Sequence, residues 1–171
     1  TPVVESTGSG GGMKLFCTGN GMNTPDITNS SRRMKIEELK LCIKNGVKDI
    51  TEAMIGFDGI AFAQSKSNKP FNISKKHLAL AVAKEVPNKN GQLIKNPYIN
   101  WSQIDKSLPD QEIIIYGPPK SSGTRDAFED MVLKDTFKIM KEYTSLYKKD
   151  KKKYKAYKKY HQIRQDGVYV P

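Results

Sequence analysis

Residues 122–125, Ser-Gly-Thr-Arg, form the stretch of this sequence best suited to hold a ligand. They follow an apolar run at 113–115 and two prolines at 118–119, which can neither continue a central strand nor lie inside a helix. Ser and Thr cap helix N-termini, so the pattern predicts a strand, a turn and a helix that begins near Ser122. The first turn of that helix would carry unpaired N–H groups, two hydroxyls and a guanidinium at the positive end of the helix dipole. This combination indicates an anion site, and phosphate suits it.

Two further turns of the sequence have the same polar, serine-rich character. Residues 5–12 follow a short apolar pair and predict a strand, a glycine-rich turn and a helix that begins at Met13. Residues 26–33 predict a short strand and a polar turn before a helical pattern over 35–45. Each turn alone is more often an ordinary helix cap or tight turn than a ligand site. Three such turns, one of them containing Arg125, favour anion binding.

In order and spacing, these three segments resemble the motifs of periplasmic phosphate-binding proteins, the substrate-binding components of phosphate ABC transporters. The Ser-Gly-Thr-Arg motif is the most specific part of the resemblance. It implies an α/β fold with the two-lobed, type II periplasmic-binding-protein architecture, in which the lobes close on the anion like a flytrap. It also implies an incomplete chain, because family members have a strand and turn before Thr1 and further strands after Pro171. Residues 1–66 would then be part of the first lobe and residues 67–171 part of the second.

The resemblance implies a set of phosphate ligands. One hydroxyl would come from the first lobe, while backbone N–H groups and hydroxyls of residues 122–124 would come from the second lobe, with Arg125 as the charge partner. Ser31 stands where many family members carry an Asp that accepts the proton of hydrogen phosphate, so rejection of sulfate would have to rest on another feature. Arg32 follows it directly and is not counted as a ligand. The predicted ligands are Ser9, Ser31, Ser122, Gly123, Thr124 and Arg125.

The function implied by the resemblance is binding for ion transport, without chemistry. Inorganic phosphate would be captured, the lobes would close about a hinge, and the ion would be delivered to a membrane ABC permease. The resemblance implies no enzyme activity, no catalytic residue, no metal site and no cofactor. The expected partners are phosphate, the permease complex and the missing segments of the same protein, and no nucleic acid is expected. The expected location is the periplasm, with the signal peptide of a secreted protein absent from this chain.

The two cysteines, Cys17 and Cys42, fall on two successive predicted helices of the same lobe. The residues themselves allow both a disulfide and a pair of buried free thiols. The family resemblance implies an oxidising compartment and therefore favours the disulfide.

A nucleotide-binding enzyme is the first rival class. The loop that starts at Gly117 departs from the P-loop pattern, because Ser122 stands at the second glycine and no Lys precedes the Thr. A catalytic mechanism would also need a base or a metal cluster, and the sequence has no set of His, Asp and Glu at ligand spacing. The sequence therefore does not support this class.

A basic nucleic-acid-binding module is the second rival class. The formal net charge is +11, and residues 147–165 are rich in Lys and Tyr. This segment predicts a long charged helix, which is more often a solvated surface than a binding site. Interleaved Lys and Tyr could instead contact a nucleic acid. No recognised nucleic-acid motif is present, and this class leaves the three serine-rich turns unexplained.

The remaining segments predict the elements that position these turns. Residues 51–63 are rich in β-formers and predict strands, and the polar stretch 64–70 predicts the crossing between lobes. A helix is predicted after Ser74, and a short helical turn at 101–105. Apolar residues after the Ser-Gly-Thr-Arg motif are spaced as a core-facing helical stripe: Phe128, Met131, Val132, Phe137 and Met140.

Overall fold

The computed structural model describes residues 7–150 and 152–171, so the strand predicted at residues 3–4 lies outside the described residues. The chain forms two compact units. Unit 1 comprises Thr1–Ala61 and Pro118–Ala127, and unit 2 comprises Phe62–Gly117 and Phe128–Pro171. The segment with the Ser-Gly-Thr-Arg motif thus belongs to unit 1, together with the two other serine-rich turns.

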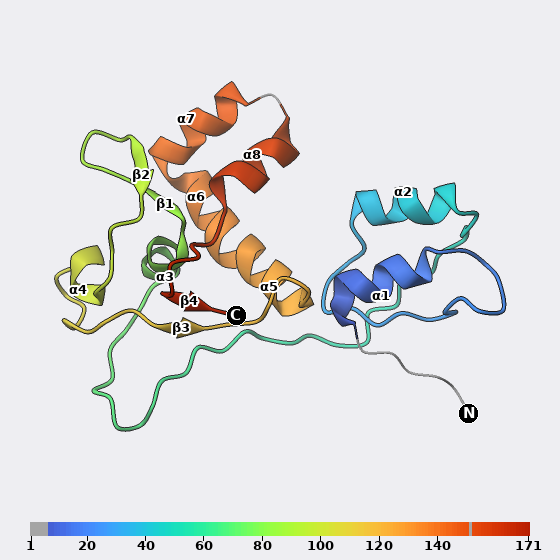
Figure 1. Ribbon diagram of the computed structural model, residues 1–171, viewed down its shortest axis with the longest axis horizontal. Helices are drawn as coiled ribbons and strands as arrows, with labels where there is room; N and C mark the ends of the chain where they lie inside the picture. Colours follow the sequence, from blue (N-terminus) through green and yellow to red (C-terminus); the bar gives the residue numbers. More distant parts are fainter. Residues whose placement is uncertain (1–6, 151) are drawn as a thin grey trace. The chain divides into compact units, whose positions relative to one another are not determined.

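Unit 1 is built from α1 (Gly8–Phe16), α2 (Ile36–Lys44) and the first residues of α5 (Gly123–Phe128) (Figure 1). A disulfide joins Cys17, just after α1, to Cys42 in α2. Both cysteines are fully buried in a small apolar cluster, packed with Val47, Phe16, Met34, Leu41 and Ile50. The disulfide and this cluster hold α1 against α2.

Helix α1 begins at Gly8, so the prediction of a glycine-rich turn followed by a helix from Met13 is wrong. Glycine is a poor helix former, but at two positions of α1 close packing leaves no room for a side chain. A Cβ at Gly12 would lie 2.7 Å from Thr28 Oγ1, and one at Gly11 would lie 2.7 Å from Thr7 Cβ. These two glycines therefore allow close approach of neighbouring side chains to the helix backbone.

Residues 26–27 and 51–63 are described by the structure, but they do not form the strands predicted for them. In the described part of the chain, no backbone–backbone hydrogen bond involves residues 51–63. The side chains of Ile55 and Phe57 are 96% and 94% exposed. Strand propensity expresses packing on a pleated surface beside a paired neighbour. Residues 51–63 have the composition of strands, but among the described residues no neighbouring strand pairs with them.

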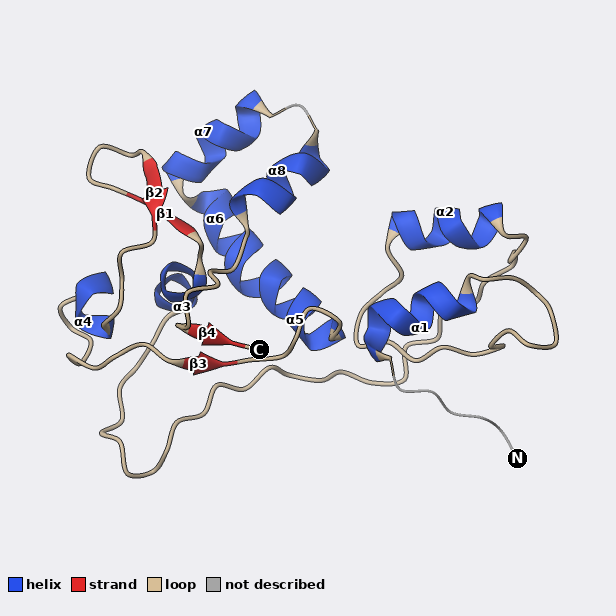
Figure 2. Ribbon diagram, in the orientation of Figure 1, coloured by secondary structure: helices blue, strands red, loops and turns tan. Residues whose placement is uncertain are grey.

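Unit 2 combines helices with two small sheets (Figure 2). Strands β1 (Glu85–Pro87) and β2 (Leu93–Lys95) pair antiparallel, and β3 (Ile115–Tyr116) pairs parallel with β4 (Tyr169–Val170). The helices before β3 are α3 (Lys75–Val82) and α4 (Trp101–Ile104). The prediction of a helix after Ser74 is confirmed, and the Ser74 hydroxyl caps it by accepting the His77 N–H at 3.1 Å. Trp101 is buried.

A continuous helical run leads from α5 through a π-helical turn, η1 (Glu129–Lys134), into α6 (Asp135–Ile139). The helix start predicted near Ser122 is confirmed. The predicted stripe is only partly buried, because Met131 is half exposed while Leu133 is buried. A π turn adds a residue to the helical repeat and shifts which side chains face the core.

The basic segment near the C-terminus forms two helices, α7 (Lys141–Lys149) and α8 (Lys153–Tyr160), so the prediction of one long helix over 147–165 is wrong. Beneath them, Phe137 of α6 and Tyr143 of α7 are fully buried and stack with ring centroids 3.9 Å apart. Over residues 7–150 and 152–171, no helix combines the length and the apolar character that a membrane span requires. The mixed helix and strand content is consistent with the α/β class.

Candidate anion site

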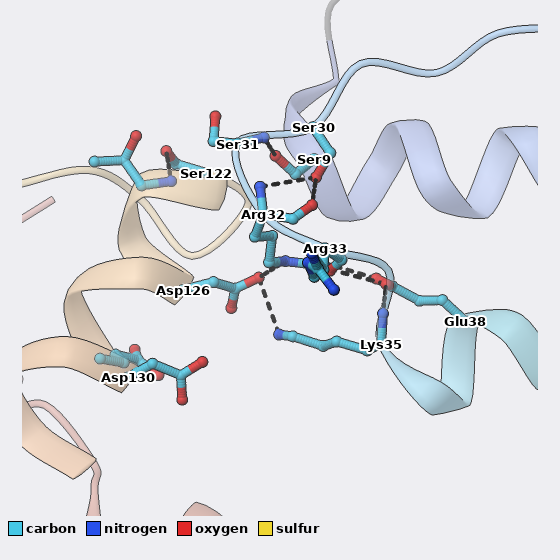
Figure 3. A network of polar contacts seen from close by, with 12 residues as sticks. Ser9, Ser30, Ser31, Arg32, Arg33, Lys35, Glu38, Ser122, Asp126 and Asp130 are labelled. Carbon is cyan, nitrogen blue, oxygen red and sulfur yellow. Dashed lines mark hydrogen bonds and ion pairs between the residues drawn. The ribbon is translucent and has the colours of Figure 1, made fainter. Parts of the chain in front are cut away.

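Three residues from distant parts of the sequence meet in unit 1: Ser9, Ser31 and Gly123. The Ser31 N–H donates a hydrogen bond to Ser9 Oγ at 3.1 Å (Figure 3). A Cβ at Gly123 would collide with Ser9 Oγ, and would lie 2.9 Å from Ser9 Cβ and 3.3 Å from Ser31 Cβ. Only glycine fits at position 123, and its backbone therefore comes directly against both serines.

The start of α1 also lies against the loop that leads into α5. Gly8 has φ +70°, which L side chains rarely adopt, and a Cβ there would collide with the Ser121 carbonyl oxygen. Ser9 is only 6% exposed at this contact. The N-terminal residues of the two helices thus lie side by side, where backbone N–H groups have no acceptor within their own helix.

The Ser-Gly-Thr part of the motif is partly engaged within the chain. The Ser122 hydroxyl accepts the Thr124 N–H at 3.2 Å, and the Ser122 N–H donates to the Pro119 carbonyl at 3.0 Å. The Gly123 N–H finds no acceptor among residues 7–150 and 152–171. Thr124 is exposed, as is Ser31. The donors that remain for a ligand are the Gly123 N–H and the hydroxyls of Ser9, Ser31 and Thr124.

Arg125, the predicted charge partner, is only 5% exposed. Its Nη1 donates to the Pro118 carbonyl at 3.2 Å, within the turn that precedes α5. A guanidinium keeps its charge when buried. The structure thus places a fixed positive charge in unit 1, two residues after Gly123.

Arg32 lies between two carboxylates (Figure 3). Its Nη1 and Nη2 donate to Glu38 at 2.9 and 2.7 Å, and its Nε donates to Asp126 at 2.8 Å. Lys35 Nζ reaches the same Asp126 oxygen at 3.0 Å. The network ties the segment that carries Ser31 to the first turns of α2 and α5.

These contacts shift the pKa values of both partners. The hydrogen bond with the Glu38 carboxylate raises the pKa of Arg32, against the effect of burial. Burial acts to raise the pKa of Glu38, but hydrogen bonds from Arg32 and the Lys35 N–H outweigh it, so this pKa lies below its ordinary value of 4.5. Arg32 is therefore a positioning residue whose charge is matched by carboxylates.

The residue pattern of the sequence did not predict this network. A partial signal was present, because Glu38 occupies the third position of α2 and accepts the Lys35 N–H at 2.8 Å, as in a capping box. Asp126 gave no signal, since its partners are more than 90 residues away in the sequence. Among the described residues, no group of three or more His, Cys, Asp and Glu side chains is placed to hold a metal ion.

The family model described as a PBP superfamily domain matches residues 1–165. The chain belongs to the PBP superfamily. This finding confirms the family resemblance seen in the sequence.

Named relatives of this PBP superfamily chain share its sequence over about three quarters of its length. Protein SphX of Synechococcus elongatus is 34% identical over 131 residues, which is 77% of this chain and 35% of the relative. Protein SphX of Synechocystis sp. is 34% identical over 130 residues, 76% of this chain and 35% of the relative. The phosphate-binding protein PstS of Staphylococcus saprophyticus is 30% identical over 129 residues, 75% of this chain and 35% of the relative.

The chain therefore spans about a third of the length of these curated relatives. No solved structure matches this PBP superfamily chain.

Proposed function

We propose that this PBP superfamily chain carries ligands for inorganic phosphate in a receptor that feeds a membrane ABC permease. The observation that carries the proposal is the contact of Ser9 and Ser31 with the backbone of Gly123, at the adjoining starts of α1 and α5. Relatives of the chain include proteins named as phosphate-binding. The proposed ligands are Ser9, Ser31, Ser122, Gly123, Thr124 and Arg125.

The chemistry of these groups suits a tetrahedral oxyanion. Phosphate oxygens accept hydrogen bonds, and this region offers neutral donors: the Gly123 N–H and the hydroxyls of Ser9, Ser31 and Thr124. Helix N-termini favour negative charge, and Arg125 adds a full positive charge. Ser9 is buried, which reduces the competition of water for its hydroxyl. Such a set binds an anion and leaves its bonds unchanged, so we propose no catalysis and no cofactor.

Residue 31 would set the choice between anions. A Cβ added at Gly123 would lie 3.3 Å from Ser31 Cβ, so the Ser31 side chain lies beside the start of α5. A serine hydroxyl can donate to any oxyanion and carries no charge that would repel a fully deprotonated one. We propose that sulfate competes with phosphate at this site.

The proposal extends to the architecture and location of the whole protein. The receptor would be the two-lobed α/β flytrap, with residues 1–66 and 67–171 contributing to its two lobes. It would close on phosphate and deliver it to the permease complex from the periplasmic or outer side of the membrane. The Cys17–Cys42 disulfide supports an oxidising compartment.

Isothermal titration of phosphate into the chain tests the ligand set. We expect one saturable site, and a loss of affinity of about 10- to 100-fold in Ser9→Ala and in Arg125→Gln, because each removes a hydrogen bond to a charged ligand. Ser145→Ala is the matched control, since its hydroxyl bonds the Glu142 carbonyl in unit 2. Absence of phosphate binding, or equal affinities in folded Ser9→Ala and wild-type protein, would refute the assignment.

A further inference from the structure

Helices α7 and α8 of unit 2 contact one another (Figure 1). Their sequences carry a dense group of lysines. Within it, Lys155 and Lys159 lie one helical turn apart on α8, and Lys155, Lys158, Lys159 and Gln162 line one shallow hollow of the surface. We define the lysine patch as the exposed side chains of Lys148, Lys149, Lys152, Lys155, Lys158 and Lys159. The proposed phosphate site uses none of these lysines.

Four of the six patch lysines carry charge that no described carboxylate pairs. In the described part of the chain, Lys148, Lys149, Lys152 and Lys155 form no ion pair with a carboxylate. Elsewhere in unit 2 the pattern differs, since Lys134 pairs with Asp130 at 2.9 Å across one helical turn.

Lysines three and four residues apart repel each other and weaken a helix. Because their charges have the same sign, they create a positive potential at the surface, which attracts extended anionic partners.

Three aromatic side chains near these lysines, Tyr147, Tyr157 and Tyr160, make ring contacts within the protein. The ring of Tyr147 makes an edge contact with Tyr160 at 5.6 Å, and Tyr157 makes one with His161 at 4.9 Å. Lys159 Nζ lies 5.2 Å from the centre of the Tyr160 ring. Single-stranded nucleic acids need open ring faces on which bases stack. The three described tyrosines are engaged within the protein, so in the described part of the patch charge is the feature presented to a partner.

The patch also lacks the means to insert into a hydrophobic layer. Among the described residues after Met140, no large apolar side chain is exposed. A surface of this kind suits electrostatic contact with a flat array of anionic headgroups, held without insertion.

We infer that the lysine patch docks this protein on an anionic phospholipid surface. The choice of a membrane as the partner rests on the proposed function, in which the receptor meets a membrane permease. Each lysine near an anionic membrane increases partitioning roughly fivefold. Removal of three lysines should therefore reduce it about 100-fold. Salt should weaken the contact, because the charges are exposed.

Co-sedimentation with lipid vesicles tests this inference. The patch variant carries Lys155→Gln, Lys158→Gln and Lys159→Gln. The matched control carries Lys69→Gln, Lys89→Gln and Lys95→Gln, which removes the same charge from exposed positions of unit 2 outside the patch. We expect the wild type and the control to bind vesicles that contain phosphatidylglycerol at low salt, and to ignore pure phosphatidylcholine. The patch variant should bind about 100-fold more weakly.

Three results would overturn the inference: no binding of wild type to anionic vesicles, equal losses in the two triple variants, or tighter binding to a short DNA duplex than to vesicles. Phosphate titration of the same proteins separates this inference from the proposed function. The patch variant should keep the phosphate affinity of the wild type. Vesicle binding without phosphate binding would refute the proposed function and leave the docking surface supported.

Discussion

Substitution of Gly123 by alanine should destabilise unit 1 and abolish anion binding together. The new methyl group would collide with Ser9 Oγ and lie 2.9 Å from Ser9 Cβ, so the Ser9 side chain would have to move. Overpacking of a tight contact costs about 1–3 kcal/mol. Displacement of Ser9 would also break its hydrogen bond with the Ser31 N–H, which costs about 1 kcal/mol more. The better helix propensity of alanine would offset roughly 1 kcal/mol.

The net expectation is a loss of roughly 1–3 kcal/mol in the free energy of unfolding. Urea denaturation followed by far-UV circular dichroism measures it. Gly21→Ala is the matched control, because no atom lies within 4 Å of its Cβ position; its stability should change by less than about 1 kcal/mol. The double variant Ser9→Gly, Gly123→Ala lacks the clash. Its loss in the free energy of unfolding should therefore be smaller than the sum of the losses in the two single variants. Wild-type stability of Gly123→Ala, or strict additivity in the double variant, would refute the packing argument.

Three further predictions follow from single features. Replacement of Cys17 and Cys42 by serine should cost about 3 kcal/mol in urea denaturation, because the disulfide closes a loop with a sequence separation of 25, and unchanged stability would contradict this. Burial lowers the pKa of His161 from 6.5 to about 4. Between pH 6.5 and about 4 the imidazole is therefore protonated in the unfolded chain but not in the folded protein, so stability should fall as the pH drops through this range. His161→Phe should flatten that part of the pH profile, and an unaltered slope would show that other groups cause it. Ser31→Asp should weaken sulfate binding about tenfold or more relative to phosphate, because a carboxylate repels an anion without a proton; an unchanged ratio by competition titration would place residue 31 outside the site.

The sequence was informative where local chemistry decides the structure. Two prolines followed by serines predicted the start of α5, and the Ser74 cap predicted α3, because capping depends on neighbours within one turn. The family resemblance grouped the three serine-rich turns, and the structure brings Ser9, Ser31 and Gly123 into contact.

The failures have a common physical cause, which is dependence on partners distant in the sequence. Residues 51–63 have the composition of strands but no pairing neighbour among the described residues. The glycines at the start of α1 were predicted to form a turn, whereas they lie in a helix, where Gly12 packs closely against Thr28. The partnership of Arg32 with Asp126 spans 94 positions, and no local pattern signals it.

The central claim is that phosphate binds at the adjoining starts of α1 and α5. A titration of isotope-labelled protein with phosphate, followed by amide resonances in nuclear magnetic resonance spectra, tests it most directly. The account predicts saturable shifts at the amides of Ser9, Ser31 and residues 123–125, with little change in α7 and α8. Shifts confined to the lysine patch, or none at the amide of Gly123, would contradict it.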